Sequence, residues 1–400
     1  MRTALLASFA LVLAACGPAP AAAPTPTAQP KPAAPTTLPA QPTAAAAQPT
    51  APAASSAPTA APAAPATAAG NDQAVAEFYR GKNIRYIVGY GPGGGYDTYA
   101  RLVARYLGKY LPGNPTVVVE NLPGAGSKLS FSQIANSLPK DGTVIGFGDG
   151  GLSVTSLLNP SDFDFDFAKL QYLGTPSVFE YLMFITRAAS ERSGVKKFDD
   201  TLGPNGKQLV MGVTSTGLDY ITQTLMKEIL GANLKIVPGY AGSAAIRLAM
   251  DSGELDGYTN GWDSIHATND EDIISGNWLL LTRLTEQPIA GMPPQLQASV
   301  PGWLDYAKSD DDKQILRLAG TATQVVGRAT YLAPGVPAER VAALRSAFMK
   351  ALADPDLKGE ADKAKLELNP VSGDQLQASM NQILAMPDPI KARLKTILKV

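Results

Sequence analysis

The chain has 400 residues, with 34 Lys and Arg, 35 Asp and Glu, one His and one Cys. A formal charge of −1 gives no electrostatic footprint for nucleic acid or for an anionic membrane surface. One cysteine excludes an intrachain disulfide and any multi-Cys metal site, and one histidine excludes a multi-His site. We therefore expect no metal site, no cofactor and no nucleic-acid partner.

The N-terminus has the layout of an export signal. One basic residue, Arg2, precedes a mostly apolar stretch over residues 4–15, which is too short to span a bilayer. The sequence Leu13-Ala14-Ala15-Cys16 resembles the lipobox of bacterial lipoproteins. The resemblance implies lipidation of Cys16, cleavage before it, and an extracytoplasmic chain (periplasmic or at the cell surface) that is anchored to the membrane. The alternative is an ordinary signal peptide that happens to contain Cys16.

Residues 17–70 form a predicted linker. They hold 23 Ala, 14 Pro and 8 Thr, with Lys31 as the only charge. Such a segment has almost nothing large to bury, and its prolines oppose regular structure, so we expect it to be disordered. Directly after a lipidated cysteine, a linker of this kind would hold a soluble body away from its membrane.

The remaining residues predict two α/β units in series. In the first, apolar strands alternate with a helix of period 3.6, which indicates a parallel sheet covered on both faces, with glycine-rich loops at its carboxyl edge. The pattern restarts near Tyr181. The predicted strands are 84–89, 116–120, 143–147, 181–186, 208–213, 234–237 and 278–281, with helices at 99–111, 128–137, 220–230 and 244–252. A strand around 325–332 and helices from Ala338 would return to the first lobe.

Residues 89–94 match the G-x-G-x-x-G motif after a predicted strand, and Glu120 stands where a ribose-binding acid could lie. A dinucleotide-dependent enzyme is therefore an alternative. Pro92, however, removes one backbone N–H from this loop, and further residues separate the motif from the helix. The same glycines expose N–H groups at a helix N-terminus, which is an anion site that needs no cofactor. Asp97 is interpreted as the N-cap of this helix rather than as a general base.

Two aromatic residues stand on predicted loops of the second unit. Tyr240 and Trp262 lie at the carboxyl edge of its sheet, where an aromatic side chain can form the wall of a ligand cleft. We therefore include both among the candidate binding residues.

Several motifs together resemble the receptors of tripartite tricarboxylate transporters, the TctC or Bug solute-binding proteins. The most specific is the Glu-Asn-x-Pro-Gly-Ala-Gly run at residues 120–126, and the others support it by order and spacing. The resemblance covers residues 78–380. It is carried by Gly93–Asp97 with Ala100-Arg101, Val118–Ser127, Pro139–Thr143, Tyr240–Gly242, Gly253–Asp256 and Leu332–Pro337.

The resemblance implies a two-lobed Venus-flytrap fold of type II. Each lobe would be a mostly parallel sheet flanked by helices, with lobe 1 formed by residues 71–180 and 325–400 and lobe 2 by residues 181–324. Hinge connections are expected near 178–182 and 322–328. A carboxylate between helix N-termini of both lobes would favour the closed state, because only that state gives it both sets of hydrogen bonds.

The resemblance also implies where the ligand binds. The first-lobe loop runs from Tyr90 to Asp97, and the second-lobe loop continues with Gly217-Leu218 where family members often have Gly-Ser. With the aromatic residues, the candidate ligand-binding residues are Tyr90, Gly93, Gly94, Gly95, Tyr96, Asp97, Gly148, Asp149, Ser215, Thr216, Gly217, Tyr240, Gly242 and Trp262.

We thus expect a monomeric, non-enzymatic receptor that captures a small organic acid. It would deliver this acid to a membrane permease of one large and one small subunit. A receptor for another transporter class, or a sensor component, is the nearest alternative.

Overall fold

A computed structural model describes residues 66–214 and 217–399, without the side chains of residues 66–71. The predicted signal segment with Cys16, most of the predicted linker, and the candidate residues Ser215 and Thr216 lie outside the described residues. Helix α1 (Ala66–Tyr79) begins inside the predicted linker, so residues 66–70 are helical. No proline follows Pro65 in that stretch, and alanine-rich sequence without proline favours a helix.

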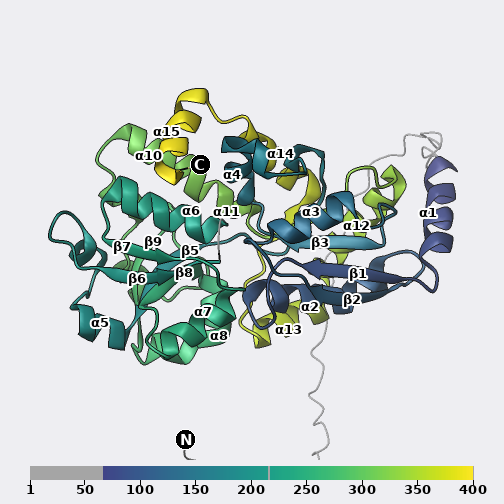
Figure 1. Cartoon of the computed structure of the whole chain (residues 1–400). Coiled ribbons are helices and arrows are strands. Elements are labelled where there is room, and N and C mark those ends of the chain that lie inside the picture. Colours follow the sequence, from purple (N-terminus) through teal and green to yellow (C-terminus); the bar gives the residue numbers. More distant parts are fainter. Residues whose placement is uncertain (1–65, 215–216, 400) are drawn as a thin grey trace, which may run out of the picture. The chain divides into compact units, whose positions relative to one another are not determined.

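The first sheet has six strands in the order β11-β4-β10-β3-β1-β2 (Figure 1). β1 pairs in parallel with β2 and β3, whereas β10 is antiparallel to β3 and β4, and β11 is antiparallel to β4. The strands are β1 (Asn83–Val88), β2 (Thr116–Asn121), β3 (Val144–Gly148), β4 (Gln171–Thr175), β10 (Ala329–Leu332) and β11 (Val371–Ser372). We call this sheet and the helices packed on it the first lobe.

The second sheet has five strands in the order β7-β6-β8-β5-β9. β6 pairs in parallel with β7 and β8, and β5 pairs antiparallel with β8 and β9. The strands are β5 (Tyr181–Thr186), β6 (Leu209–Gly212), β7 (Leu234–Val237), β8 (Gly257–Gly261) and β9 (Trp278–Arg283). This sheet and its helices form the second lobe.

Both sheets are mixed, whereas the sequence predicted mostly parallel sheets. The antiparallel pairs arise where the chain passes from one sheet to the other. β5 follows β4 directly and enters the second sheet opposite in direction to β8, and β10 enters the first sheet opposite to β3. The limits of the lobes and the position of the hinges stay predictions.

Helices cover both faces of the second sheet (Figure 1). Leu182 and Phe184 of β5 pack with Ile246 and Trp262 of α7 and α8, whereas Met183 packs on the α6 side. This alternation is the period-2 pattern of a strand buried on both faces. The helices of this lobe are α5 (Arg187–Ser193), α6 (Leu218–Leu225, continued as a π-helix over Met226–Leu230), α7 (Ser243–Asp251), α8 (Trp262–Ile274), α9 (Pro294–Ser299) and α10 (Asp310–Ile315, continued as a π-helix over Leu316–Thr321).

Helix α2 packs along β1 and β2 of the first sheet and against α12. Its apolar residues Tyr99, Leu102 and Val103 are buried, as the period-3.6 pattern predicted. The other helices are α3 (Lys128–Asn136), α4 (Leu152–Leu158), α11 (Thr323–Val326), α13 (Pro355–Lys363), α14 (Gly373–Leu384) and α15 (Asp388–Leu398), with α2 at Gly95–Tyr110 and α12 at Ala338–Ala353. Among the described residues, none of the helices combines the length and apolar character that crossing a bilayer requires.

Candidate functional site

A cavity opens where the loops of the two lobes meet. It encloses about 470 Å³ of empty space, a volume that includes its open mouth. Residues of both lobes line it: Tyr90, Gly91, Gly94, Gly95, Tyr96, Phe179, Tyr181, Thr214, Asp219, Ser243, Ile246, Tyr258, Thr259, Asn260 and Ser264. Asp219 is the only charged residue of this lining, and the rest supply aromatic rings, hydroxyl groups and backbone.

The N-terminus of α2 faces this cavity. The first-turn N–H groups of a helix have no acceptor inside the helix, so those of Gly95 and Tyr96 are available to an anion. A side chain at Gly94 would place its Cβ 2.6 Å from Ser243 Oγ, and one at Gly95 would collide with Ser264 Oγ. The glycines therefore let the backbone of the first lobe approach the two serines of the second lobe.

Helix α7 presents a second N-terminus at the same cavity. Ser243 is its first residue, after the N-cap Gly242, and lines the cavity. One turn further on, Arg247 donates from Nη2 to the carbonyl of Gly93 in the other lobe (3.0 Å). Its Nη1 is buried without a partner among the described residues. This end of the cavity thus gathers donors and positive charge.

Asp97 lies in the first turn of α2 and is not its N-cap, which is Gly94. Its carboxylate accepts hydrogen bonds from Gly93 N (3.0 Å), Arg101 Nε (3.0 Å) and Asn121 Nδ2 (3.0 Å). Partial burial acts to raise the pKa of Asp97, but these hydrogen bonds outweigh it and lower the pKa. Asp97 therefore stays ionised and fixes the shape of the glycine loop, which explains why an acid stands there without lining the cavity.

Asp149 follows β3 and reaches across to the second lobe. Its Oδ2 accepts the N–H of Leu218 at the start of α6 (2.6 Å) and the hydroxyl of Tyr90 (3.4 Å), and its Oδ1 accepts the N–H of Gly151 (2.8 Å). The side chain is buried, and this burial raises its pKa to about 7. Burial likewise raises the pKa of Asp219.

Aromatic rings form the wall between these two ends. Tyr90 and Tyr96 are stacked with 4.3 Å between ring centroids, and Phe179 contacts Tyr96 (5.7 Å) and Tyr181 (4.7 Å). The hydroxyl of Tyr96 donates to the carbonyl of Gly327 (2.5 Å). The hydroxyl of Tyr181 has no hydrogen bond to another described residue, although its side chain is only 5% exposed. It is therefore available to a ligand.

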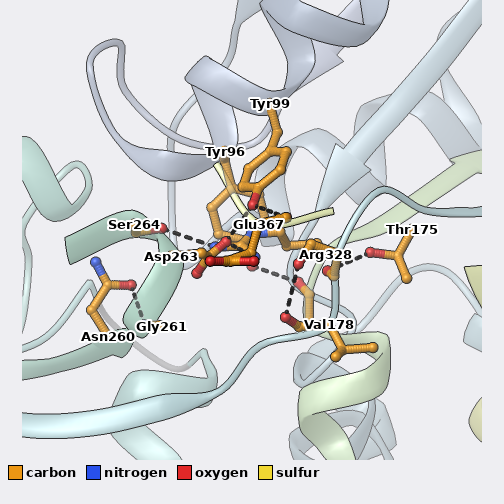
Figure 2. Close-up of polar contacts among 12 residues, drawn as sticks. Tyr96, Tyr99, Thr175, Val178, Asn260, Gly261, Asp263, Ser264, Arg328 and Glu367 are labelled. Atoms are coloured by element: carbon orange, nitrogen blue, oxygen red, sulfur yellow. Dashed lines mark hydrogen bonds and ion pairs between the residues drawn. The ribbon is translucent and has the colours of Figure 1, made fainter. Parts of the chain in front are cut away.

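A buried ion pair lies beside the cavity, between the lobes. Figure 2 shows Asp263, Ser264 and Arg328 pointing toward one another. Arg328 Nη2 donates to Asp263 Oδ1 (2.9 Å) and to Ser264 Oγ (2.8 Å), and the hydroxyl of Tyr99 donates to Asp263 Oδ2 (2.7 Å). The guanidinium also lies over the ring of Phe179, 3.9 Å from its centroid. Because Ser264 Oγ accepts from Arg328, its own proton is free to point into the cavity.

The structure places the predicted residues in three groups. Tyr90, Gly94, Gly95 and Tyr96 line the cavity. Five others are next to it in the chain or in contact with its lining: Gly93, Asp97, Asp149, Gly217 and Gly242. Gly148 is the last residue of β3 and is buried.

Tyr240 and Trp262 are elsewhere. Tyr240 lines a neighbouring cavity with Tyr90 and Thr214, and its hydroxyl donates to Glu254 (2.6 Å). Trp262 is buried in the core of the second lobe, stacked on His266, and lines neither cavity. We leave Trp262 out of the proposed site.

Sequence reasoning missed most of the second-lobe lining. β8 contains three of these residues: Tyr258, Thr259 and Asn260. The sequence does not predict this strand, because it has two glycines and few apolar residues. Ser243 and Asp219 stand in the predicted loops just before the helices at 244–252 and 220–230, and no role was predicted for them. One signal in the sequence could have identified Ser243 and Asp219. Each lies in the first turn of a helix that follows the carboxyl end of a strand, where ligands of open α/β sheets bind.

Glu120 does not support the alternative of a dinucleotide site, in which it would bind the ribose. This residue is paired with Arg85 (2.8 Å) at a half-exposed position of β2. It does not line the cavity at the glycine loop.

Two mixed α/β sheets with a cleft between them form the two-lobed, type II fold of periplasmic binding proteins. In solved structures the chain is similar to the periplasmic binding protein BugD (21% identity, TM-score 0.58, 80% of this chain and 99% of that one). It is also similar to MatC from Rhodopseudomonas palustris with bound malate (17%, 0.56, 79% and 99%) and to a TctC solute-binding protein from Polaromonas (18%, 0.50, 80% and 99%).

Sequence comparisons agree with this. A UPF0065 protein of Bordetella bronchiseptica is 24% identical over 327 residues, which are 78% of this chain and 84% of that protein. No family model matches the sequence. The similarities confirm the predicted resemblance to the TctC and Bug solute-binding proteins and the predicted fold.

Proposed function

We propose that the protein is an extracytoplasmic solute-binding receptor, without catalytic activity, that captures a small organic carboxylate in the cleft. The single observation that carries this proposal is the meeting of two helix N-termini, α2 from the first lobe and α7 from the second, at one cavity. Free N–H groups of the two helices and the Ser243 hydroxyl are the donors that a carboxylate needs, and the guanidinium of Arg247 adds positive charge one turn further along α7. The malate bound by MatC supports the same ligand class.

The carboxylate would lie across Gly95, Tyr96 and Ser243, with its chain extending along the aromatic wall. Both lobes contribute donors, so the bound ligand favours contact between the lobes. The finer proposals follow from the sequence: lipidation of Cys16, anchoring to the membrane, and delivery to a permease of a large and a small subunit. Mass spectrometry of the mature N-terminus and co-purification with the permease subunits test these finer proposals.

Removing one donor tests the cleft directly. We expect Ser243→Ala to weaken carboxylate binding by about 1–3 kcal/mol, the value of a hydrogen bond to a charged group. The affinity is measured by isothermal titration calorimetry with butyrate and 4-aminobutyrate. Ser252→Ala is the matched control, because Ser252 stands at the other, exposed end of the same helix. Equal affinities in wild type, Ser243→Ala and the control would remove α7 from the site.

A further inference from the structure

Carboxylates of the protein itself already occupy the N-terminus of α6. Asp149 Oδ2 accepts the N–H of Leu218, and Asp219 accepts the N–H groups of Thr214 (2.6 Å) and Tyr220 (2.8 Å). The first-turn amides of a helix are the groups that would otherwise hold a ligand anion. At this helix the receptor supplies the anion from its own chain.

Asp149 comes from the opposite lobe, so it takes the place that a ligand carboxylate bridging the lobes would take. Among the described residues, the groups that hydrogen-bond to its carboxylate are all donors: Leu218 N, Gly151 N and the Tyr90 hydroxyl. A Cβ atom at Gly217 would lie 2.5 Å from Oδ2, so glycine allows this close approach. A second carboxylate brought here by a ligand would meet the charge of Asp149.

The two ends of the cavity therefore differ in chemistry. α6 and α7 cover opposite faces of the second sheet, so Asp219 and Ser243 approach the cavity from opposite sides of β8. The α7 end presents helix amides, Ser243 and Arg247. The α6 end presents the carboxylate of Asp219, with Asp149 behind it, and the hydroxyl of Tyr181, which has no hydrogen-bond partner among the described residues.

Among the described residues, no spare cation neutralises the acidic α6 end. Arg328, the closest buried arginine to Tyr96 and Phe179, is paired with Asp263. Arg247 lies at the α7 end, where it donates a hydrogen bond to the carbonyl of Gly93. Aromatic rings flank the acidic end, and rings beside a carboxylate favour a positively charged group.

Resting on the function proposed above, we propose that the cleft selects a monocarboxylate whose far end carries an ammonium group or another hydrogen-bond donor, and that Asp149 excludes dicarboxylates. The ligand carboxylate binds at the α2 and α7 N-termini. Its far end donates toward Asp219 and Tyr181. Asp149 acts as a specificity-determining residue through charge.

The test compares three probes with the same four-carbon chain: butyrate, 4-aminobutyrate and succinate. Calorimetry on the wild-type protein at pH 8, above the pKa of about 7 of Asp149, is expected to rank 4-aminobutyrate tightest and succinate weakest, with at least a tenfold gap between them. This ranking needs no variant, so it holds as a test whatever the stability of any mutant. Succinate binding as tightly as 4-aminobutyrate would overturn the inference while leaving the carboxylate receptor in place.

Asp149→Asn keeps the shape of the side chain and removes its charge. We expect it to reduce the preference for 4-aminobutyrate over succinate at least tenfold. Asp141→Asn, before the other end of β3, is the matched control and should leave the preference unchanged. An unchanged preference in Asp149→Asn, with wild-type circular dichroism, would also overturn the inference. If none of the three probes, nor any other carboxylate, bound the wild type, the proposed function itself would fail.

Discussion

The carboxyl group of Asp149 changes its protonation state near neutral pH. Its pKa is raised by burial from 3.8 to about 7. Between about pH 4 and pH 7 the native state therefore holds a proton that the unfolded chain has released, so stability falls as the pH rises through this window and is level above it. Burial raises the pKa of the neighbouring Asp219 as well, which acts in the same direction.

The measurement is the melting temperature between pH 5 and pH 8. We expect it to decline with rising pH in the wild type and to decline less in Asp149→Asn. The same slope in both proteins would show that Asp149 titrates in the folded state as it does in the unfolded chain.

The ion pair of Arg328 and Asp263 is a buried electrostatic contact beside the cavity. Both side chains are buried, so removing one partner leaves an uncompensated charge. We expect Asp263→Asn to lower the free energy of unfolding by about 3–5 kcal/mol, measured by chemical denaturation. The control is Glu120→Gln, which breaks the pair with Arg85 at about 40% exposure and should cost at most ~1 kcal/mol. Similar losses in both variants would contradict the special role of the buried pair.

At the scale of elements, the sequence predicts most of the units around the cleft. β1, β2, β5 and β7 lie within a residue of their predicted bounds, because each is a short apolar run, and glycine or proline also bounds β1, β2 and β7. The glycine loop before α2 was also placed correctly at the cavity. These features depend on local sequence, which is why they could be predicted.

Features that depend on distant partners could not be predicted. β8 is a strand because it pairs with β5 and β6, since Gly257–Gly261 shows no alternation of apolar and polar residues. Its Gly257 packs directly against the backbone of Phe184. Likewise, the occupation of α6 by Asp149 joins residues that are 69 positions apart. The sequence predicts a loop at Trp262 and therefore a place in the cleft wall, whereas in the structure α8 begins at this residue.

The burial of Trp262 gives a test of its placement. Trp262→Phe should lower the free energy of unfolding by about 1–3 kcal/mol, because it removes buried ring atoms in the core of the second lobe. We expect the affinity for carboxylates to stay within twofold of the wild type. A large loss of affinity at unchanged stability would return Trp262 to the ligand site.

At the scale of the molecule, the two lobes meet through apolar packing, which includes α6 against α15, and through polar contacts. They include Gly91 N to the carbonyl of Ala241 (3.0 Å) and the bond from Leu218 to Asp149. Only two connections of the chain join the sheets, after β4 and before β10, so opening needs few changes in backbone angles. A ligand that adds donors from both lobes therefore shifts the population toward the closed state.

Small-angle X-ray scattering tests this shift. We expect the radius of gyration to decrease when a carboxylate that binds is added, and to stay constant with one that does not bind. A molecule that binds its ligand at constant radius would show that capture needs no movement of the lobes.

The most direct test of the central claim is thermal unfolding of the purified protein against a panel of mono-, di- and tricarboxylates, amino acids, and NAD(H). A ligand at about 100 times its dissociation constant adds roughly 2.7 kcal/mol, which raises a melting temperature by a few degrees. The account predicts such a rise with monocarboxylates, the largest rise with those that carry an amino group, and the smallest rise with dicarboxylates. A rise with NAD(H) alone would contradict it, because the glycine loop would then be a cofactor site.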